Sequence, residues 1–155
     1  MKPLLISRCL LGEKCRYDGR SKPLQAEALQ ALSERFVLIP VCPEELGGLP
    51  TPRNPSERRG DRVVMADGTD VTEAFRLGAS RARTLAAAGG AAAALLKEKS
   101  PSCGKGKIYD GSFTGTLIEG NGVTAEALLG AGLAVYGESE IEDLLSEELG
   151  VQSEE

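Results

Sequence analysis

The sequence of 155 residues contains no histidine and no tryptophan, and aromatic residues make up only 4% of it. The lack of histidine excludes Ser-His-Asp and Cys-His catalytic systems, mixed Cys/His zinc sites and the commonest general base. Acid–base chemistry therefore falls to carboxylates, lysines, tyrosines or water. Hydrophobic residues make up 41% of the chain, so the scarcity of aromatics predicts an aliphatic core.

Long apolar runs and an excess of positive charge are missing as well. No run approaches the roughly 18–20 residues that span a bilayer, and the apolar segment 4–6 is too short for a signal peptide. A net charge of −5 and a pI near 5.0 argue against binding to nucleic-acid duplexes or anionic membranes. We expect one cytosolic domain over residues 1–150 with a frayed tail at 151–155, as a monomer or a dimer.

Strand and helix patterns alternate along the chain, which is typical of the α/β class. This alternation predicts a doubly wound, Rossmann-like three-layer sandwich with a mostly parallel sheet of four to five strands and a small hairpin. The expected strands cover 4–7, 36–41, 91–96 and 133–136, and the expected helices cover 23–35, 71–88, 124–129 and 141–149.

Some of these elements carry more specific expectations. The continuous apolar run 36–41 predicts a strand that is covered on both faces. The alanine-rich segment 91–96 has a helix as its rival interpretation, because alanine is a poor strand former. Segment 62–71 predicts a hairpin that turns at Asp67-Gly68. Asp70 with Glu73 predicts a capping box for the helix at 71–88, and Ser139 with Glu142 predicts one for the helix at 141–149. Thr124 is expected to cap the helix at 124–129.

Three cysteines follow predicted buried strands. Cys9 comes after the first strand, Cys42 closes the second, and Cys103 lies a few residues past the third. Because ligands bind beyond the carboxyl ends of parallel strands, we expect these thiols to converge on one spot. Three soft ligands at one spot indicate a metal centre with an open coordination position.

Several kinds of site remain compatible with the cysteines. Cytosolic cysteines stay reduced, so a disulfide framework is disfavoured. Structural zinc is disfavoured because no C-x2-C pair is present, whereas an iron–sulfur cluster tolerates scattered thiolates, and Cys42-Pro43 resembles a dipeptide of ferredoxin ligands. The cysteines could instead be small buried hydrophobic residues. Cys15 is a candidate fourth ligand, a reactive thiol near Arg16, or a structural residue.

Three long loops, 9–22, 42–60 and 100–122, hold further candidates, since loops of this length are usually functional. Glu44 could act as acid or base near a cluster, or be a solvated glutamate. Ser100 and Ser102 flank Pro101 and could donate to a ligand or merely form a turn. The cations Arg16, Arg53 and Lys99 could bind an anionic cluster or substrate.

A set of short motifs, spread over residues 4–136, identifies a family resemblance. The motifs are Cys9-Leu10-Leu11-Gly12, Cys15-Arg16-Tyr17-Asp18-Gly19, Cys42-Pro43-Glu44, Gly47-Gly48-Leu49-Pro50, Pro52-Arg53, Asp70-Val71-Thr72, Lys99-Ser100-Pro101-Ser102-Cys103-Gly104, Ile108-Tyr109-Asp110-Gly111 and Gly122-Val123-Thr124. Together they resemble the bacterial thiouracil desulfidases, a family long known only as a domain of unknown function. The second domain of some longer relatives is absent from this sequence.

The resemblance implies a [4Fe-4S] cluster held by Cys9, Cys42 and Cys103, with one iron free. It implies removal of sulfur from a thiolated pyrimidine to give uracil and sulfide, with Glu44 as acid/base and Ser100 assisting. A soft thiocarbonyl sulfur suits an open iron site, which would polarise the C=S bond. Two alternatives remain: a sulfur-transfer protein of thionucleoside metabolism, and a non-catalytic iron–sulfur or zinc module.

Overall fold

A four-stranded parallel sheet forms the centre of the molecule. The computed structural model describes the backbone of residues 1–154 and the side chains of residues 1–147. The strands lie in the order β2, β1, β5, β8, and each pair of neighbours is parallel. Their bounds are Phe36–Val41 for β2, Lys2–Ser7 for β1, Ala93–Leu96 for β5 and Ala134–Gly137 for β8.

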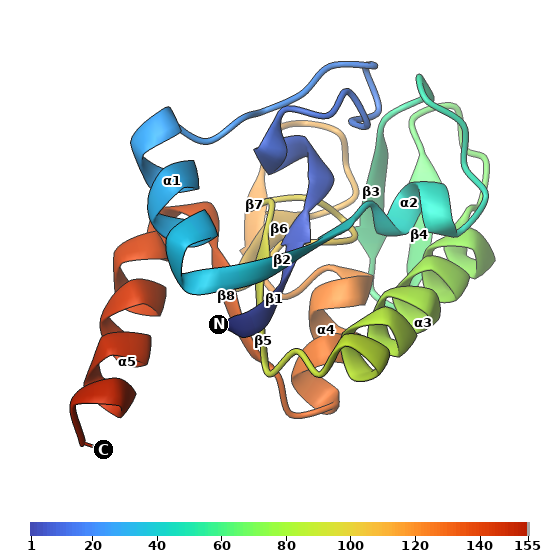
Figure 1. The fold of residues 1–155 in the computed structure, drawn as a ribbon. Coiled ribbons are helices and arrows are strands. Elements are labelled where there is room, and N and C mark those ends of the chain that lie inside the picture. The colour runs from blue at the N-terminus through green and yellow to red at the C-terminus, as the bar shows by residue number, and fades with distance from the viewer. Residues whose placement is uncertain (155) are drawn as a thin grey trace.

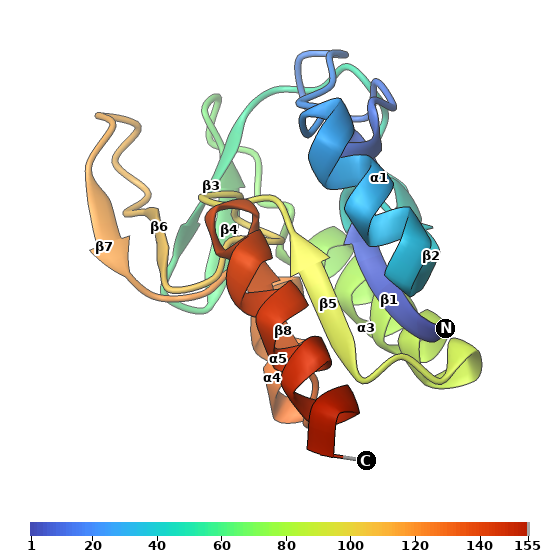
Figure 2. The same ribbon diagram turned by 60° about the vertical axis from the view of Figure 1, so that its left-hand side comes forward.

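Helices cover both faces of this sheet, which gives three layers (Figures 1 and 2). Alternate residues of β1 point to opposite faces: Leu4 and Ile6 pack in the cluster that contains Leu32, while Leu5 packs with Leu128. The first cluster lies under α1 and α5, and the second under α3 and α4. The bounds are Ala26–Arg35 for α1, Thr72–Gly89 for α3, Val123–Gly130 for α4 and Ile141–Glu154 for α5.

The predicted α/β sandwich is therefore confirmed, and so is the choice of strand over helix for the alanine-rich segment. Two small antiparallel pairs, β3–β4 and β6–β7, stand beside the main sheet (Figure 2). The smaller elements are η1 (Arg8–Leu11), α2 (Pro43–Leu46), β3 (Ser56–Arg59), β4 (Arg62–Met65), β6 (Lys107–Tyr109), β7 (Leu117–Glu119) and η2 (Glu138–Glu140).

Two predictions about the strands were wrong, and a third was confirmed. The strand β2 lies at the edge of the sheet and is not covered on both faces: Val37 is 50% exposed, and Pro40, which has no N–H to donate, suits an edge position. The hairpin expected at 62–71 is present: Met65 N–H donates to the Thr69 carbonyl at 2.8 Å and Val71 N–H to the Val63 carbonyl at 2.9 Å, on either side of a bridge between Val64 and Asp70. The strand β4 also pairs with β3, which the sequence did not predict. The loop 100–122 contains the pair β6–β7.

Helix ends also differ from their predictions. The helix α1 begins at Ala26, three residues later than expected. The Asp70 carboxylate accepts a hydrogen bond from the backbone N–H of Thr72 at 2.9 Å, outside the expected capping box. Ser139 donates to Glu98 at 2.7 Å and does not cap α5, which continues past 149 to Glu154.

Of the tail expected to fray, Glu155 lies outside the described residues. Among the described residues, no helix has both the length and the apolar character needed to cross a membrane.

Candidate functional site

A cavity of about 490 Å³ opens at the carboxyl edge of the central sheet. Its volume falls within the roughly 300–1,000 Å³ typical of sites for small molecules. The last residues of β1 and β2, Ser7 and Val41, line it, and so does Lys97, which directly follows β5. The cavity therefore lies where the topology of a parallel α/β sheet places a ligand.

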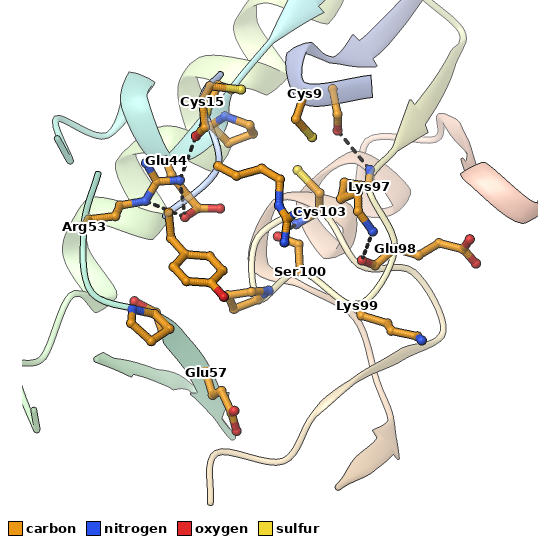
Figure 3. Close-up of a pocket in the computed structure, with 18 of the residues that line it drawn as sticks. Cys9, Cys15, Glu44, Arg53, Glu57, Lys97, Glu98, Lys99, Ser100 and Cys103 are labelled. Atoms are coloured by element: carbon orange, nitrogen blue, oxygen red, sulfur yellow. Dashed lines mark hydrogen bonds and ion pairs between the residues drawn. The ribbon is translucent and has the colours of Figure 1, made fainter. Parts of the chain in front are cut away.

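All four cysteines line this cavity, and all four are free and buried. Cys9 lies in η1, directly after β1, and Cys42 links β2 to α2. Cys103 lies in the turn that follows β5, on the same wall as Cys9 in Figure 3. The structure thus brings together the three thiols that the strand ends predicted. Cys15 joins them, and its backbone carbonyl accepts a hydrogen bond from Cys42 Sγ at 3.7 Å.

Three of the four thiols are held in the protonated form. Burial raises the pKa of Cys103 to about 12. A hydrogen bond with Cys15 and then burial raise the pKa of Cys42. The hydrogen bond with Cys42 lowers the pKa of Cys15, but the bond with Cys9 and burial outweigh it and raise that pKa to about 11. Thiols in such an apolar pocket are inert by themselves and become thiolates when a metal displaces the proton.

The donors around the cavity fit an iron–sulfur cluster. All four are buried thiols, and cysteine thiolates are the ligands that hold such clusters. Soft sulfur donors favour iron–sulfur clusters or zinc over hard cations such as magnesium or calcium.

Glu44 reaches the cavity from α2, and Arg53 holds it there (Figure 3). Arg53 Nε donates to Glu44 Oε2 at 2.9 Å, and Nη2 forms an ion pair with the same oxygen at 2.8 Å. Nη2 also donates to the backbone carbonyl of Cys15 at 3.1 Å. Burial raises the pKa of the Glu44 carboxyl, and the charge of Arg53 opposes that rise. Arg53 therefore ties the carboxylate to the loop that carries the fourth thiol.

The helix α2 is fixed against α3 by direct contact of their backbones. A Cβ atom added to Gly78 would lie 1.9 Å from the Pro43 carbonyl oxygen, and one added to Gly47 would lie 2.0 Å from that of Ala74. Neither position has room for a side chain, so both require glycine. This close approach positions the start of α2, which carries Cys42 and Glu44.

The two candidate serines have different surroundings. Ser100 Oγ, which lines the cavity, accepts the backbone N–H groups of Ser102 and Cys103 at 3.1 and 3.0 Å. Its own O–H is left to donate to a ligand. Ser102 is absent from the lining, and its hydroxyl lies 2.8 Å from that of Thr124, both fully buried. Thr124 was expected to cap α4, but Gly122 occupies the N-cap position.

The predicted cations Arg16 and Lys99 also line the cavity. The guanidinium of Arg16 lies 5.9 Å from the centre of the Tyr17 ring. Lys99 has a positive φ of 67°, an uncommon backbone conformation for a residue with a side chain.

Sequence reasoning gave no role in the site to several other residues of the lining, although Tyr17 and Tyr109 fall within the motifs of the family resemblance. They are Arg8, Tyr17, Glu57, Lys97, Glu98, Tyr109 and Phe113.

Comparison with known proteins identifies the family. The sequence matches the 2-thiouracil desulfurase family over residues 4–140. The chain belongs to this family. It is 41% identical over 152 residues to the uncharacterized protein YbbK of Bacillus subtilis (strain 168), and this match covers 92% of the present chain and 99% of YbbK. A solved structure of the [4Fe-4S]-dependent thiouracil desulfidase TudS is 44% identical, with a TM-score of 0.92 over 97% of this chain and 99% of that one.

Proposed function

We propose that the protein is a [4Fe-4S]-dependent thiouracil desulfidase. It would replace the thiocarbonyl sulfur of a thiolated pyrimidine with oxygen from water and release sulfide, with no net transfer of electrons. The observation that carries this proposal is the convergence of Cys9, Cys42 and Cys103 on one cavity that Glu44 and Ser100 also line. Membership of the 2-thiouracil desulfurase family supports it, and we place the reaction in the cytosol, where thiols stay reduced.

The three strand-end thiols fit the cluster that the proposal requires. Cys9, Cys42 and Cys103 would each supply one thiolate, which leaves one of the four irons without a ligand from the protein. When bound, the cluster would offer that iron to the soft thiocarbonyl sulfur as a Lewis acid. The remaining functions of the site fall to side chains of this chain.

Glu44 and Ser100 would handle the protons. The Glu44 carboxylate would accept a proton from the water that attacks the ring carbon, and Arg53 would hold the carboxylate in place through its hydrogen bond and ion pair. Ser100 would donate its free O–H to the bound ring, because its oxygen already accepts two backbone N–H groups.

A turnover assay tests this proposal. The protein is reconstituted anaerobically with iron and sulfide and incubated with 2-thiouracil or 4-thiouracil, and uracil and sulfide are quantified. Glu44→Gln should lower the rate by about 10²- to 10⁴-fold with unchanged cluster content. Glu27→Gln, at an exposed position of α1, is the matched control. A stable cluster without turnover of either compound, or full activity in Glu44→Gln, would contradict the proposal.

One observation favours a second candidate, a closed and non-catalytic iron–sulfur module. Cys15 is 3% exposed, lines the same cavity and contacts Cys42, so a fourth thiolate is at hand. In that case Cys15→Ala would lose the cluster. In a desulfidase, the same variant would keep both the cluster and the turnover.

A further inference from the structure

Half of the aromatic residues of this chain line the cavity. The chain has three tyrosines and three phenylalanines, and of these Tyr17, Tyr109 and Phe113 are in the lining. The other three, Phe36, Phe75 and Tyr136, are buried in the hydrophobic clusters of the core. A chain so poor in aromatics therefore places three of them around a single site, two from the β6–β7 hairpin and one from the loop after η1.

Phe113 is the most unusual of the three. Its φ is 58°, in the left-handed region that residues with a side chain rarely adopt. Phe113 is only partly buried, and among the described residues it belongs to none of the three hydrophobic clusters. Packing of the core therefore does not explain its ring. Strained residues that the surrounding structure holds in place concentrate at functional sites.

The strand β3 holds the loop of Phe113 in this conformation. Glu57 Oε1 accepts the backbone N–H groups of both Gly111 and Phe113, at 2.9 and 3.1 Å. Two residues further along β3, Arg59 Nε donates to the Gly111 carbonyl oxygen at 2.6 Å. Glu57 and Arg59 lie on the same face of the strand because side chains alternate. In Figure 3, Glu57 lies across the cavity from Cys9.

We propose that Phe113 is a specificity-determining residue that stacks on the flat heteroaromatic ring of the substrate, and that Glu57 is the positioning residue that holds it in the cavity. The proposal rests on the proposed function for the identity of that ring. An aromatic side chain recognises the face of a base, whereas hydrogen-bonding groups such as Glu44 and Ser100 recognise its edge. Stacking would therefore select flat aromatic rings over saturated ones that carry the same polar groups.

Binding of uracil and of 5,6-dihydrouracil to the cluster-loaded protein tests the role of Phe113. The two compounds carry the same carbonyl and N–H groups, but only uracil has a flat aromatic ring. Isothermal titration should show tighter binding of uracil. Phe113→Leu should weaken uracil binding by at least about fivefold and change dihydrouracil binding less than about twofold, while Phe113→Tyr should restore the preference. Equal affinity of the wild type for both compounds, or an unchanged preference in Phe113→Leu, would overturn the proposal.

Variants of Glu57 test the positioning role with the same two compounds. Glu57→Ala should lose the uracil preference, and Glu57→Gln should keep most of it because the amide oxygen can accept the same two N–H groups. The double variant Glu57→Ala/Phe113→Leu should bind uracil no more weakly than either single variant, since both remove one interaction. Additive losses, or a preserved preference in Glu57→Ala, would overturn the positioning role.

These binding results are independent of turnover. Failure to release sulfide from thiouracil would overturn the proposed function, while the preference for uracil over dihydrouracil would still decide the stacking role. Turnover without a preference for uracil over dihydrouracil would overturn the stacking role alone.

Discussion

The two sides of the cavity are built in different ways. The thiol side follows the carboxyl ends of β1, β2 and β5, and the first and last of these are interior strands of the main sheet. The aromatic side, defined by Tyr109, Phe113 and Glu57, belongs to two small antiparallel pairs whose strands are three or four residues long. Side-chain hydrogen bonds such as those of Glu57 hold that side together.

From this difference we infer that the thiol side carries the chemistry of the site and that the aromatic side selects the substrate. A site that rests on strands and their immediate ends is positioned more accurately than one on loops, and a cluster requires several thiolates at fixed separations. The aromatic side has only to present a ring, which a small hairpin can do. We therefore expect variants on the thiol side to change the cluster or the fold, and variants on the aromatic side to change affinity for the substrate.

The largest effect is expected at the three proposed ligands. Serine in place of Cys9, Cys42 or Cys103 should remove the cluster and all turnover, because in the proposed site each thiolate would hold a separate iron. Cys15→Ser should keep more than half of the iron and of the activity. Assays of iron, acid-labile sulfide and uracil formation check this, and equal losses in all four variants would favour the closed four-thiolate module.

The second-largest effect is expected at the ion pair between Arg53 and Glu44, which adjoins the thiol side. Arg53→Met should destabilise the protein by about 3 kcal/mol, because it leaves Glu44 in a largely buried position without a partner. Adding Glu44→Gln to that variant should recover part of the loss. Arg62→Met is the control, since its pair with Asp70 is exposed to solvent and contributes little to stability. Denaturant titrations measure both, and equal losses would show that the Arg53 pair is not special.

Substituting one glycine on each side of the cavity compares the thiol side with the aromatic side directly. Gly78→Ala would force α2 away from α3 and should cost about 1–3 kcal/mol together with part of the cluster. Gly111→Ala, at a φ of 94° where its Cβ would meet the Arg59 side chain, should weaken uracil binding and leave the cluster intact. Gly130→Ala is the control, because nothing lies within 4 Å of its Cβ.

Denaturation, iron content and uracil titration are measured on all three glycine variants. Loss of the cluster in Gly111→Ala, or a fully loaded and stable Gly78→Ala, would remove the distinction between the two sides.

The smallest effect separates the two serines. Ser102→Ala should lower stability by about 1–2 kcal/mol, because it leaves the buried hydroxyl of Thr124 without its partner, and should leave turnover per cluster unchanged. Ser100→Ala should lower turnover, since its free hydroxyl faces the cavity. Parallel denaturation and turnover assays decide the matter, and a loss of turnover in Ser102→Ala alone would reverse the assignment.

The same contrast explains what the sequence could reveal. The apolar runs that end near Cys9 and Cys42 mark strands, and the residues that follow parallel strands meet at the carboxyl edge of the sheet, so the thiol side was predictable. The strand β3 reads Ser-Glu-Arg-Arg and has no apolar alternation, so its pairing and the role of Glu57 gave no local signal. The bond from Arg53 to the Cys15 carbonyl joins residues 38 positions apart, which no spacing rule anticipates.

The central claim is that three thiolates leave one iron of the cluster open to the substrate. Mössbauer spectroscopy of the iron-57-loaded protein, recorded anaerobically with and without 4-thiouracil, tests it most directly. We expect one iron in four to change its spectrum when the compound is added, in the wild type and in Cys15→Ser alike. A spectrum that does not change for any of the four irons when the compound is added, or a single distinct iron that appears only after Cys15 is replaced, would contradict this expectation.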